Sequence, residues 1–232
     1  VPFHNAGPAR ITAEITDDHL PADNLRNMVS IVRERVSILC VDGSNGDAGR
    51  LLVSALLARS DGIKDEDYVV RSIPWISLPS EKLDEVDVMI LANVPEITVE
   101  QVEDLSRFVR KGNGLVWFAG ENVESTLWNE RMTKGPTPLL PAMLREPVEV
   151  GTALGAGRPL SPDMPLHGVC LPLRSLPEDL FSETLFLKRL EIEPLPSGSP
   201  VLNLAGSGAQ ILMEHSLGRG HVFLFTTSAE TS

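Results

Sequence analysis

The segment from Thr98 to Glu121 constrains the fold more than any other part of the chain. Thr98 and Gln101 have the spacing of a capping box, and apolar residues recur at helical intervals from there to Val109. Gly112 predicts the end of that helix, and the apolar run 115–118 that follows is too short to form another. Taken in this order, the signals predict a capped helix followed by a parallel strand that is buried on both faces.

The turn after this strand lies where open α/β sheets place their chemistry, at the carboxyl ends of the strands. A nucleophile there would be lifted above the sheet and could use nearby backbone N–H groups to hold an oxyanion. Ala119 and Gly120 carry no reactive group. Glu121 is a candidate general acid or base, with helix capping as the alternative. The sequence therefore predicts a fold that can carry an active site at this turn, but no obvious catalytic residue in that place.

From residue 36 onward, apolar strand patterns alternate with helical ones. Successive units of this kind predict an α/β fold with right-handed crossovers and a doubly wound, flavodoxin-like, mostly parallel sheet. The expected strands in this part are 37–41, 68–73, 86–92 and 115–118. After residue 133, dense prolines predict an irregular insertion that extends to about residue 183. Strands are expected again as a C-terminal antiparallel extension at 185–192, 201–204, 210–214 and 222–226, the last two forming a hairpin.

The first 35 residues alternate between apolar and polar positions on both sides of a polar loop, which predicts a β-hairpin. A lone hairpin is marginal in water, so we expect it to pack on the main domain or to end a preceding β-sandwich domain. It could pair within its own chain or swap between copies, which makes a homo-oligomer possible. The sequence begins at Val1 rather than Met, and we expect it to be a piece of a longer protein.

The composition limits the kinds of molecule that we expect this chain to bind. The chain has 32 acidic and 20 basic residues, a formal net charge of -12, and no Lys/Arg cluster, which argues against nucleic acid and anionic membranes. No apolar stretch approaches the ~18 residues of a membrane-spanning helix, so we expect no direct membrane insertion by this segment. Cys40 and Cys170 lie in apolar surroundings outside any C-x-x-C motif and are expected to be buried free thiols.

The loop 42–49 joins a predicted strand to the start of a predicted helix, a position that suits anions. Its glycines do not match the dinucleotide fingerprint, and Asp42 and Asp47 would repel a phosphate. Asp42 and Ser44 also partly resemble the metal site of von Willebrand factor A domains, although Gly46 stands in place of its second serine. The ligand-binding candidates are Asp42, Ser44, Asn45 and Asp47, with helix capping as the alternative.

The histidines do not indicate a metal site or a catalytic pair. None of the five lies at metal-ligand spacing from another or from a cysteine. Glu214 and His215 are neighbours on a predicted strand and should point to opposite faces. The sequence therefore predicts no metal and no cofactor.

Four segments together resemble the class I glutamine amidotransferase-like superfamily, and in particular its ThuA-like branch: 36–43, 87–93, 108–120 and 218–228. In amidotransferases of this family, a nucleophilic cysteine follows the strand that here ends at Phe118, and a His-x-Glu pair follows a late strand. Here the first position holds Ala119 or Gly120, and the second holds Ser228 and Glu230 without the histidine. The resemblance therefore implies the fold but not glutamine hydrolysis, because nucleophile and base are both missing.

Residues 17–24 resemble the corresponding part of large bacterial membrane-anchored proteins that combine a von Willebrand A domain with an amidotransferase-like domain. This resemblance implies a soluble part of a cell-envelope protein, whose partners are proteins or other domains of the same polypeptide. We expect a non-catalytic interaction or ligand-binding module. The alternative is a ThuA-like hydrolase or sugar-handling enzyme that uses the carboxylates of Asp42, Glu121 or Glu230.

Overall fold

The computed structural model of the 232-residue chain describes residues 6–15, 24–44, 46–58, 68–135, 137–151 and 157–230. The chain divides into two compact units. The first comprises Val1–Val36 with Arg59–Val69, and the second comprises Ser37–Ala58 with Val70–Ser232. Asn45 and most of the polar loop predicted near the N-terminus lie outside the described residues.

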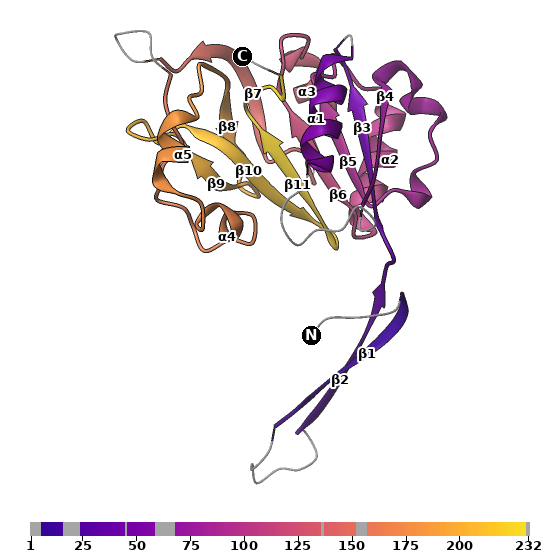
Figure 1. Cartoon of the computed structure of the whole chain (residues 1–232). Helices are drawn as coiled ribbons and strands as arrows, with labels where there is room; N and C mark the ends of the chain where they lie inside the picture. The colour runs from indigo at the N-terminus through magenta and orange to yellow at the C-terminus, as the bar shows by residue number, and fades with distance from the viewer. Residues whose placement is uncertain are drawn as a thin grey trace. The chain divides into compact units, whose positions relative to one another are not determined.

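The first unit contains the predicted hairpin, formed by β1 (Gly7–Glu14) and β2 (Leu25–Val32) and drawn in indigo in Figure 1. The strands pair antiparallel in a continuous register that places Ile11 opposite Met28. Several large apolar side chains of this hairpin are exposed, among them Val29 at 70% and Ile31 at 76%. The prediction of an N-terminal β-hairpin is confirmed.

The second unit is built on a seven-stranded mixed sheet with the order β4-β3-β5-β6-β11-β10-β9 (Figure 1). Neighbouring strands run parallel from β3 through β5 and β6 to β11, and antiparallel from β11 through β10 to β9. This confirms the α/β class and the antiparallel C-terminal extension. The strands are β3 (Val36–Asp42), β4 (Tyr68–Pro74), β5 (Val88–Ala92), β6 (Gly114–Phe118), β9 (Ser199–Asn203), β10 (Gln210–Leu217) and β11 (Gly220–Phe225).

The helix that follows β5 has the ends that its sequence predicts. The Thr98 side chain accepts a hydrogen bond from the Gln101 N–H, and the Gln101 side chain accepts one from the Thr98 N–H, which completes the capping box. Gly112 follows the helix with φ +116°, a conformation that glycine adopts without strain. The helices are α1 (Asp47–Leu57), η1 (Trp75–Ser80), η2 (Leu83–Glu85), α2 (Val99–Arg110), α3 (Ser125–Met132), α4 (Cys170–Leu173) and α5 (Glu178–Glu183).

The region 133–183, for which the sequence predicts an irregular insertion, contains a strand. This strand, β7 (Ala142–Glu149), pairs antiparallel with β8 (Lys188–Pro194) in a separate two-stranded sheet. Pro147 does not prevent the pairing because the register shifts between Leu144 and Pro147, and a shift of this kind accommodates a residue without an N–H.

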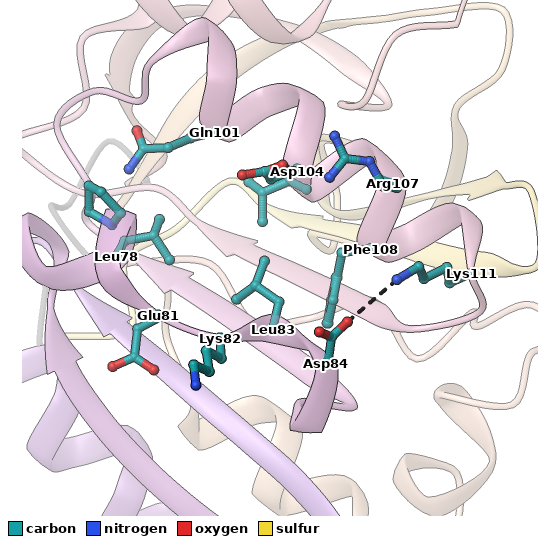
Figure 2. A pocket seen from close by; sticks show the side chains of 12 residues that line it. Leu78, Glu81, Lys82, Leu83, Asp84, Gln101, Asp104, Arg107, Phe108 and Lys111 are labelled. Atoms are coloured by element: carbon teal, nitrogen blue, oxygen red, sulfur yellow. Dashed lines mark hydrogen bonds and ion pairs between the residues drawn. The ribbon is translucent and has the colours of Figure 1, made fainter.

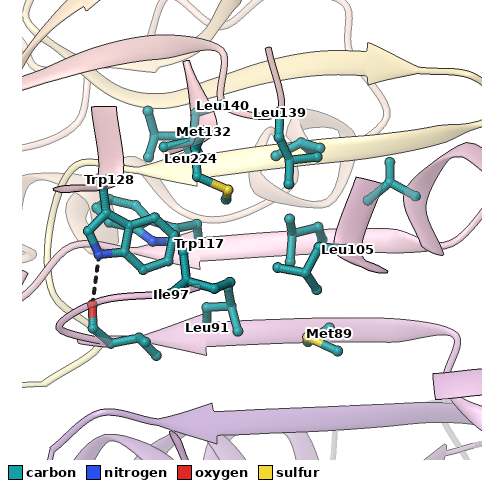
Figure 3. Close-up of a cluster of buried hydrophobic side chains, with 14 of the residues drawn as sticks. Met89, Leu91, Ile97, Leu105, Trp117, Trp128, Met132, Leu139, Leu140 and Leu224 are labelled. Atoms are coloured by element: carbon teal, nitrogen blue, oxygen red, sulfur yellow. Dashed lines mark hydrogen bonds between the residues drawn. The ribbon is translucent and has the colours of Figure 1, made fainter. Parts of the chain in front are cut away.

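The main hydrophobic core lies between the sheet, α2 and α3 (Figure 3). The rings of Trp117 on β6 and Trp128 on α3 meet edge to face, with centroids 5.3 Å apart. The Trp128 indole N–H donates to the carbonyls of Val94 and Pro95, so this side chain also fixes the chain that leaves β5. The core thus supports the loops at the carboxyl ends of β5 and β6.

Candidate functional site

The carboxyl ends of four parallel strands meet at one edge of the sheet. The register places Asp42 beside Ala92, Ala92 beside Phe118, and Phe118 beside Phe225. The rings of Phe118 and Phe225 stack with centroids 4.4 Å apart. The loops after β3, β5, β6 and β11, which hold most of the candidate residues, therefore begin side by side. We call this region the carboxyl edge.

Asn93, which follows β5, connects these loops. Its side-chain N–H donates to Glu230 Oε1 at 3.1 Å, and its Oδ1 accepts from the backbone N–H of Asn122 at 2.8 Å. The Asn122 side chain in turn donates to the Gly43 carbonyl at 3.0 Å. Asn93 is only 5% exposed and has φ 54°, a left-handed conformation that asparagine tolerates better than most residues. The loops after all four strands are thus joined by hydrogen bonds.

The Asn93 side chain fills the space beside Gly120, one of the two positions at which the resemblance would place a nucleophile. A Cβ atom built on Gly120 would lie 2.2 Å from Cγ and Oδ1 of Asn93. Ala119 is buried, and its N–H donates to the Phe225 carbonyl at 3.0 Å. Since the Asn122 N–H also has a partner, two backbone donors of this turn are already bonded. The turn therefore has neither a nucleophile nor space for a side chain at Gly120.

The carboxylates near this edge differ in their surroundings. Glu121 is exposed, and it does not occupy the N-cap position of α3, which belongs to Glu124. Glu230 is half-buried and points its carboxylate toward Asn93. Ser228 Oγ accepts from the Glu230 N–H and donates to the Glu230 carbonyl, both at 3.0 Å. Of the two, Glu230 is the carboxylate that the fold fixes at the edge.

Asp42 and Ser44 hold the loop that precedes α1. Asp42 is 3% exposed, and its Oδ1 accepts from the N–H and the hydroxyl of Ser44 at 2.7 and 2.6 Å. Its Oδ2 accepts from the Gly49 N–H at 2.7 Å, and Ser44 Oγ accepts from the Ala48 N–H at 3.1 Å. Both side chains thus bind N–H groups of the first turn of α1, although the N-cap residue itself is Gly46, which has no side chain to cap the helix. Asp47 lies on the surface, in an ion pair with Arg50 at 3.0 Å.

Both cysteines are buried free thiols, as the sequence predicts. Burial raises the pKa of the Cys40 thiol to about 11, with the nearby Asp42 charge adding to the effect, and burial also raises the pKa of Cys170. Neither thiol is therefore activated as a nucleophile. Within the described residues, no group of three or more His, Cys, Asp or Glu side chains could hold a metal ion.

Among the cavities is one of about 730 Å³ beside α1 and β4, which we call the arginine cavity. It adjoins the predicted ligand-binding residues Asp42 and Ser44, and Arg50 and Arg71 also line it. The sequence did not indicate either arginine, because α1 and β4 border one cavity only when β4 lies next to β3. The described residues that line it are Asp42, Ser44, Gly46, Gly49, Arg50, Val53, Ser54, Val70, Arg71, Ser72, Ile73 and Pro74.

A smaller cavity of about 260 Å³ lies between the η1–η2 segment and α2 (Figure 2). Its apolar lining includes Leu78, Leu83 and Phe108. Charged side chains of both signs surround these residues, and Lys111 reaches Asp84 across the cavity at 3.5 Å. The mixed charges do not favour one class of ligand.

No known protein family matches the chain by sequence, and no curated protein does. Solved structures do resemble it. The cytoplasmic proteins STM1381 from Salmonella typhimurium LT2 and STM3548 from Salmonella typhimurium align with TM-scores of 0.55 and 0.54, at 12% and 14% identity. The alignments cover 98% and 97% of this chain, and 87% and 86% of those chains.

Two further solved structures also resemble this chain. The mmIFT52 N-terminal domain aligns with a TM-score of 0.53 and 14% identity, over 82% of this chain and 86% of that one. A β-galactosidase from Bacillus circulans sp. alkalophilus aligns with a TM-score of 0.53 and 13% identity, over 84% of this chain but only 29% of the enzyme. At such identities, these likenesses show the fold alone.

No helix in the described part of the chain is both long and apolar enough to cross a membrane.

Proposed function

We propose that this chain is a non-catalytic, amidotransferase-like domain that serves as an interaction or ligand-binding module of a larger, membrane-anchored bacterial protein. The observation that carries the proposal is the contact between Gly120 and Asn93. The place where this fold would present its nucleophile holds a buried amide, and a Cβ atom on Gly120 would lie 2.2 Å from it. A surface built in this way can bind other molecules, but neither Ala119 nor Gly120 offers a side chain for covalent catalysis.

The strand order supports the architectural part of the proposal. The part β4-β3-β5-β6-β11 follows the order 2-1-3-4-5 of a doubly wound, flavodoxin-like sheet when its strands are numbered along the chain. In that fold, ligands bind at the carboxyl ends of the strands. The arginine cavity, which Asp42 and Ser44 help to line, is the corresponding candidate for a binding site.

Measurement of ammonia release from glutamine by the purified chain tests the non-catalytic assignment. We expect no turnover above that of buffer, and no gain in the Asn93→Gly variant, which opens space at Gly120. Glutamine hydrolysis that Asn93→Gly or Glu230→Gln abolishes would show that this edge is an active site and would overturn the proposal.

The second candidate is a ThuA-like hydrolase or sugar-handling enzyme. The observation that favours it is the Glu230 carboxylate, which the structure holds at the carboxyl edge by its bond to Asn93. Chromogenic ester and glycoside substrates test this function in the unmodified chain and in the Glu230→Gln and Glu121→Gln variants. The binding module predicts no turnover in any of them, whereas a pH-dependent rate that Glu230→Gln removes would establish the hydrolase.

A further inference from the structure

The N-terminal hairpin is a sheet of only two strands, so each strand has an outer edge without a partner strand among the described residues. Large apolar side chains are exposed on both of its faces, with Met28 on one face at 59% and Ile31 on the other at 76%. An isolated two-stranded sheet is at best marginally stable in water, and an unpaired edge can bind a further strand. The hairpin therefore offers a surface for association.

The register determines which backbone groups of β1 face its outer edge. The Ile15 N–H donates to the Asn24 carbonyl at 2.9 Å, so it points toward the other strand of the hairpin. In an antiparallel pair this direction alternates along the strand, and the register from Gly7 to Glu14 is continuous. The backbone N–H and C=O groups of Arg10, Thr12 and Glu14 therefore point away from β2, where a further strand would bind them.

The side chains of these three residues lie on one face of the hairpin. Arg10 Nε and Thr12 Oγ1 both donate to Asn27 Oδ1, at 3.0 and 2.8 Å. Arg10 and Glu14 lie opposite apolar residues of β2, so neither faces an opposite charge directly across the hairpin. They are four residues apart on one strand, about 13 Å, which is too far for them to pair with each other. Arg10 also has guanidinium N–H groups beyond the one that binds Asn27.

A second copy of β1 would supply the opposite charge for both residues. When two β1 strands pair antiparallel with their Thr12 residues opposite each other, Arg10 of each copy lies opposite Glu14 of the other. The same register places Ile11 opposite Ala13 on the other face. Opposite charges and threonine pairs across neighbouring strands stabilise a sheet, and the two-fold symmetry makes each unlike contact occur twice. This register also joins the backbone groups that point outward.

The β2 edge lacks this self-complementarity. Arg26 is the only charged residue between Leu25 and Val32, so two copies of β2 cannot form a pair of opposite charges. Pairing of β1 with the β2 strand of another copy would leave new edges at both ends and would continue into a filament. The charges therefore favour a symmetric contact between two β1 strands.

We infer that two copies of this chain associate through β1 and form a four-stranded antiparallel sheet in the order β2-β1-β1-β2, with Arg10 of each copy against Glu14 of the other. The inference rests on the proposed interaction function and names a second copy of the chain as its partner. The contact lies at the edge of the hairpin and does not involve the carboxyl edge of the main sheet.

The test is sedimentation equilibrium of the whole chain up to about 0.5 mM, a range in which an association with a Kd as weak as about 1 mM is detectable. We expect the average mass to rise with concentration from one chain toward two. Amide hydrogen exchange at Arg10, Thr12 and Glu14 should slow over the same range, because their N–H groups become bonded. A single chain at every concentration would overturn the inference and leave this edge to a different partner. Growth beyond two chains would also contradict it.

Charge reversal tests the register. Arg10→Glu and Glu14→Arg should each raise the Kd about tenfold, because two attractive cross-strand pairs become repulsive. An equimolar mixture of the two variants should associate as the unmodified chain does, since the carboxylates of one variant then face the guanidinium groups of the other. Recovery in the mixture also shows that both variants are folded.

Arg26→Glu is the matched control, because it changes the charge of the hairpin by the same amount but lies on β2, away from the second copy of β1. We expect it to leave the Kd within about twofold of the unmodified chain. A loss in Arg26→Glu equal to that in Arg10→Glu, or no recovery in the mixture, would contradict the register.

The same samples separate this inference from the proposed function. Release of ammonia from glutamine by the associated chain would contradict the non-catalytic function while the β1 contact stood. A chain that neither associates nor turns over glutamine would remove the β1 contact and leave the non-catalytic function intact.

Discussion

The carboxyl edge and the arginine cavity both contain polar side chains, but the surroundings of those side chains differ. At the edge, Asn93 binds Glu230 and the Asn122 N–H, so that donors and acceptors satisfy one another. At the cavity, Arg50 and Arg71 each form an ion pair at the surface. Substitutions at the edge should therefore cost stability, whereas substitutions of Arg50 or Arg71 should leave stability nearly unchanged.

The largest expected loss of stability is that of Gly43→Ala. The new Cβ atom would lie 2.0 Å from the Asn93 carbonyl oxygen and 2.4 Å from Val94 Cα, which are backbone atoms and cannot turn aside. We expect urea unfolding to show a loss of about 3 kcal/mol, at the upper end of the usual cost of overpacking. Gly168→Ala is the control because no atom lies within 4 Å of its added Cβ. Equal stability of the two variants would show that the edge is not closely packed.

Asn93→Ala should cost about 2 kcal/mol, because it removes the partner of the Asn122 N–H and places alanine at φ 54°. Asn93→Gly separates the two causes, since glycine accepts this backbone conformation but lacks the amide. We expect a loss of about 1 kcal/mol for Asn93→Gly in the same urea experiment. A glycine variant as stable as the unmodified chain would mean that the hydrogen bonds of Asn93 do not hold the edge together.

On the cavity side, Arg50→Gln and Arg71→Gln should each change the free energy of unfolding by no more than about 0.5–1 kcal/mol, since their ion pairs lie at the surface. Chemical denaturation of both variants measures this directly. A cost as large as that of Asn93→Ala would assign the arginines to the fold and remove the contrast between the two regions.

The smallest expected effect is on the pKa of Glu81, and through it on how the stability of the fold depends on pH. Arg71 holds the pKa of Glu81 below its usual value, mainly through their hydrogen bond. Because the folded-state pKa is depressed, the ion pair contributes stability above the unfolded pKa and loses it as the pH falls through the folded pKa. In Arg71→Gln, carboxyl NMR titration should show the Glu81 pKa higher, near its usual value. An unchanged pKa would mean that Arg71 does not hold this carboxylate.

Local patterns predicted much of the fold. The capping box at Thr98, the stop at Gly112 and the C-terminal hairpin depend on neighbouring residues, and each is present in the structure. The strand β7 was not predicted, because prolines usually interrupt strands and the register shift that accommodates Pro147 depends on pairing with β8.

The candidate site was less predictable, because its key contacts join distant loops. The sequence did place Asp42, Gly120 and Glu230 at one edge of the sheet, since parallel strands end together. It did not predict that Asn93 fills the space at Gly120, because that contact depends on how close the loops after β5 and β6 approach. An asparagine directly after a buried strand, where a left-handed residue can end the strand, was the available signal.

The most direct test of the central claim is a double-mutant cycle between Gly120 and Asn93, measured by urea unfolding. If the Asn93 side chain fills the place of the nucleophile, Gly120→Ala should cost about 2 kcal/mol in the unmodified chain. In an Asn93→Gly background the same substitution should cost almost nothing, because the atoms it would meet are gone. The same cost in both backgrounds would show that Asn93 does not occupy this space and would contradict the account of a filled, non-catalytic edge.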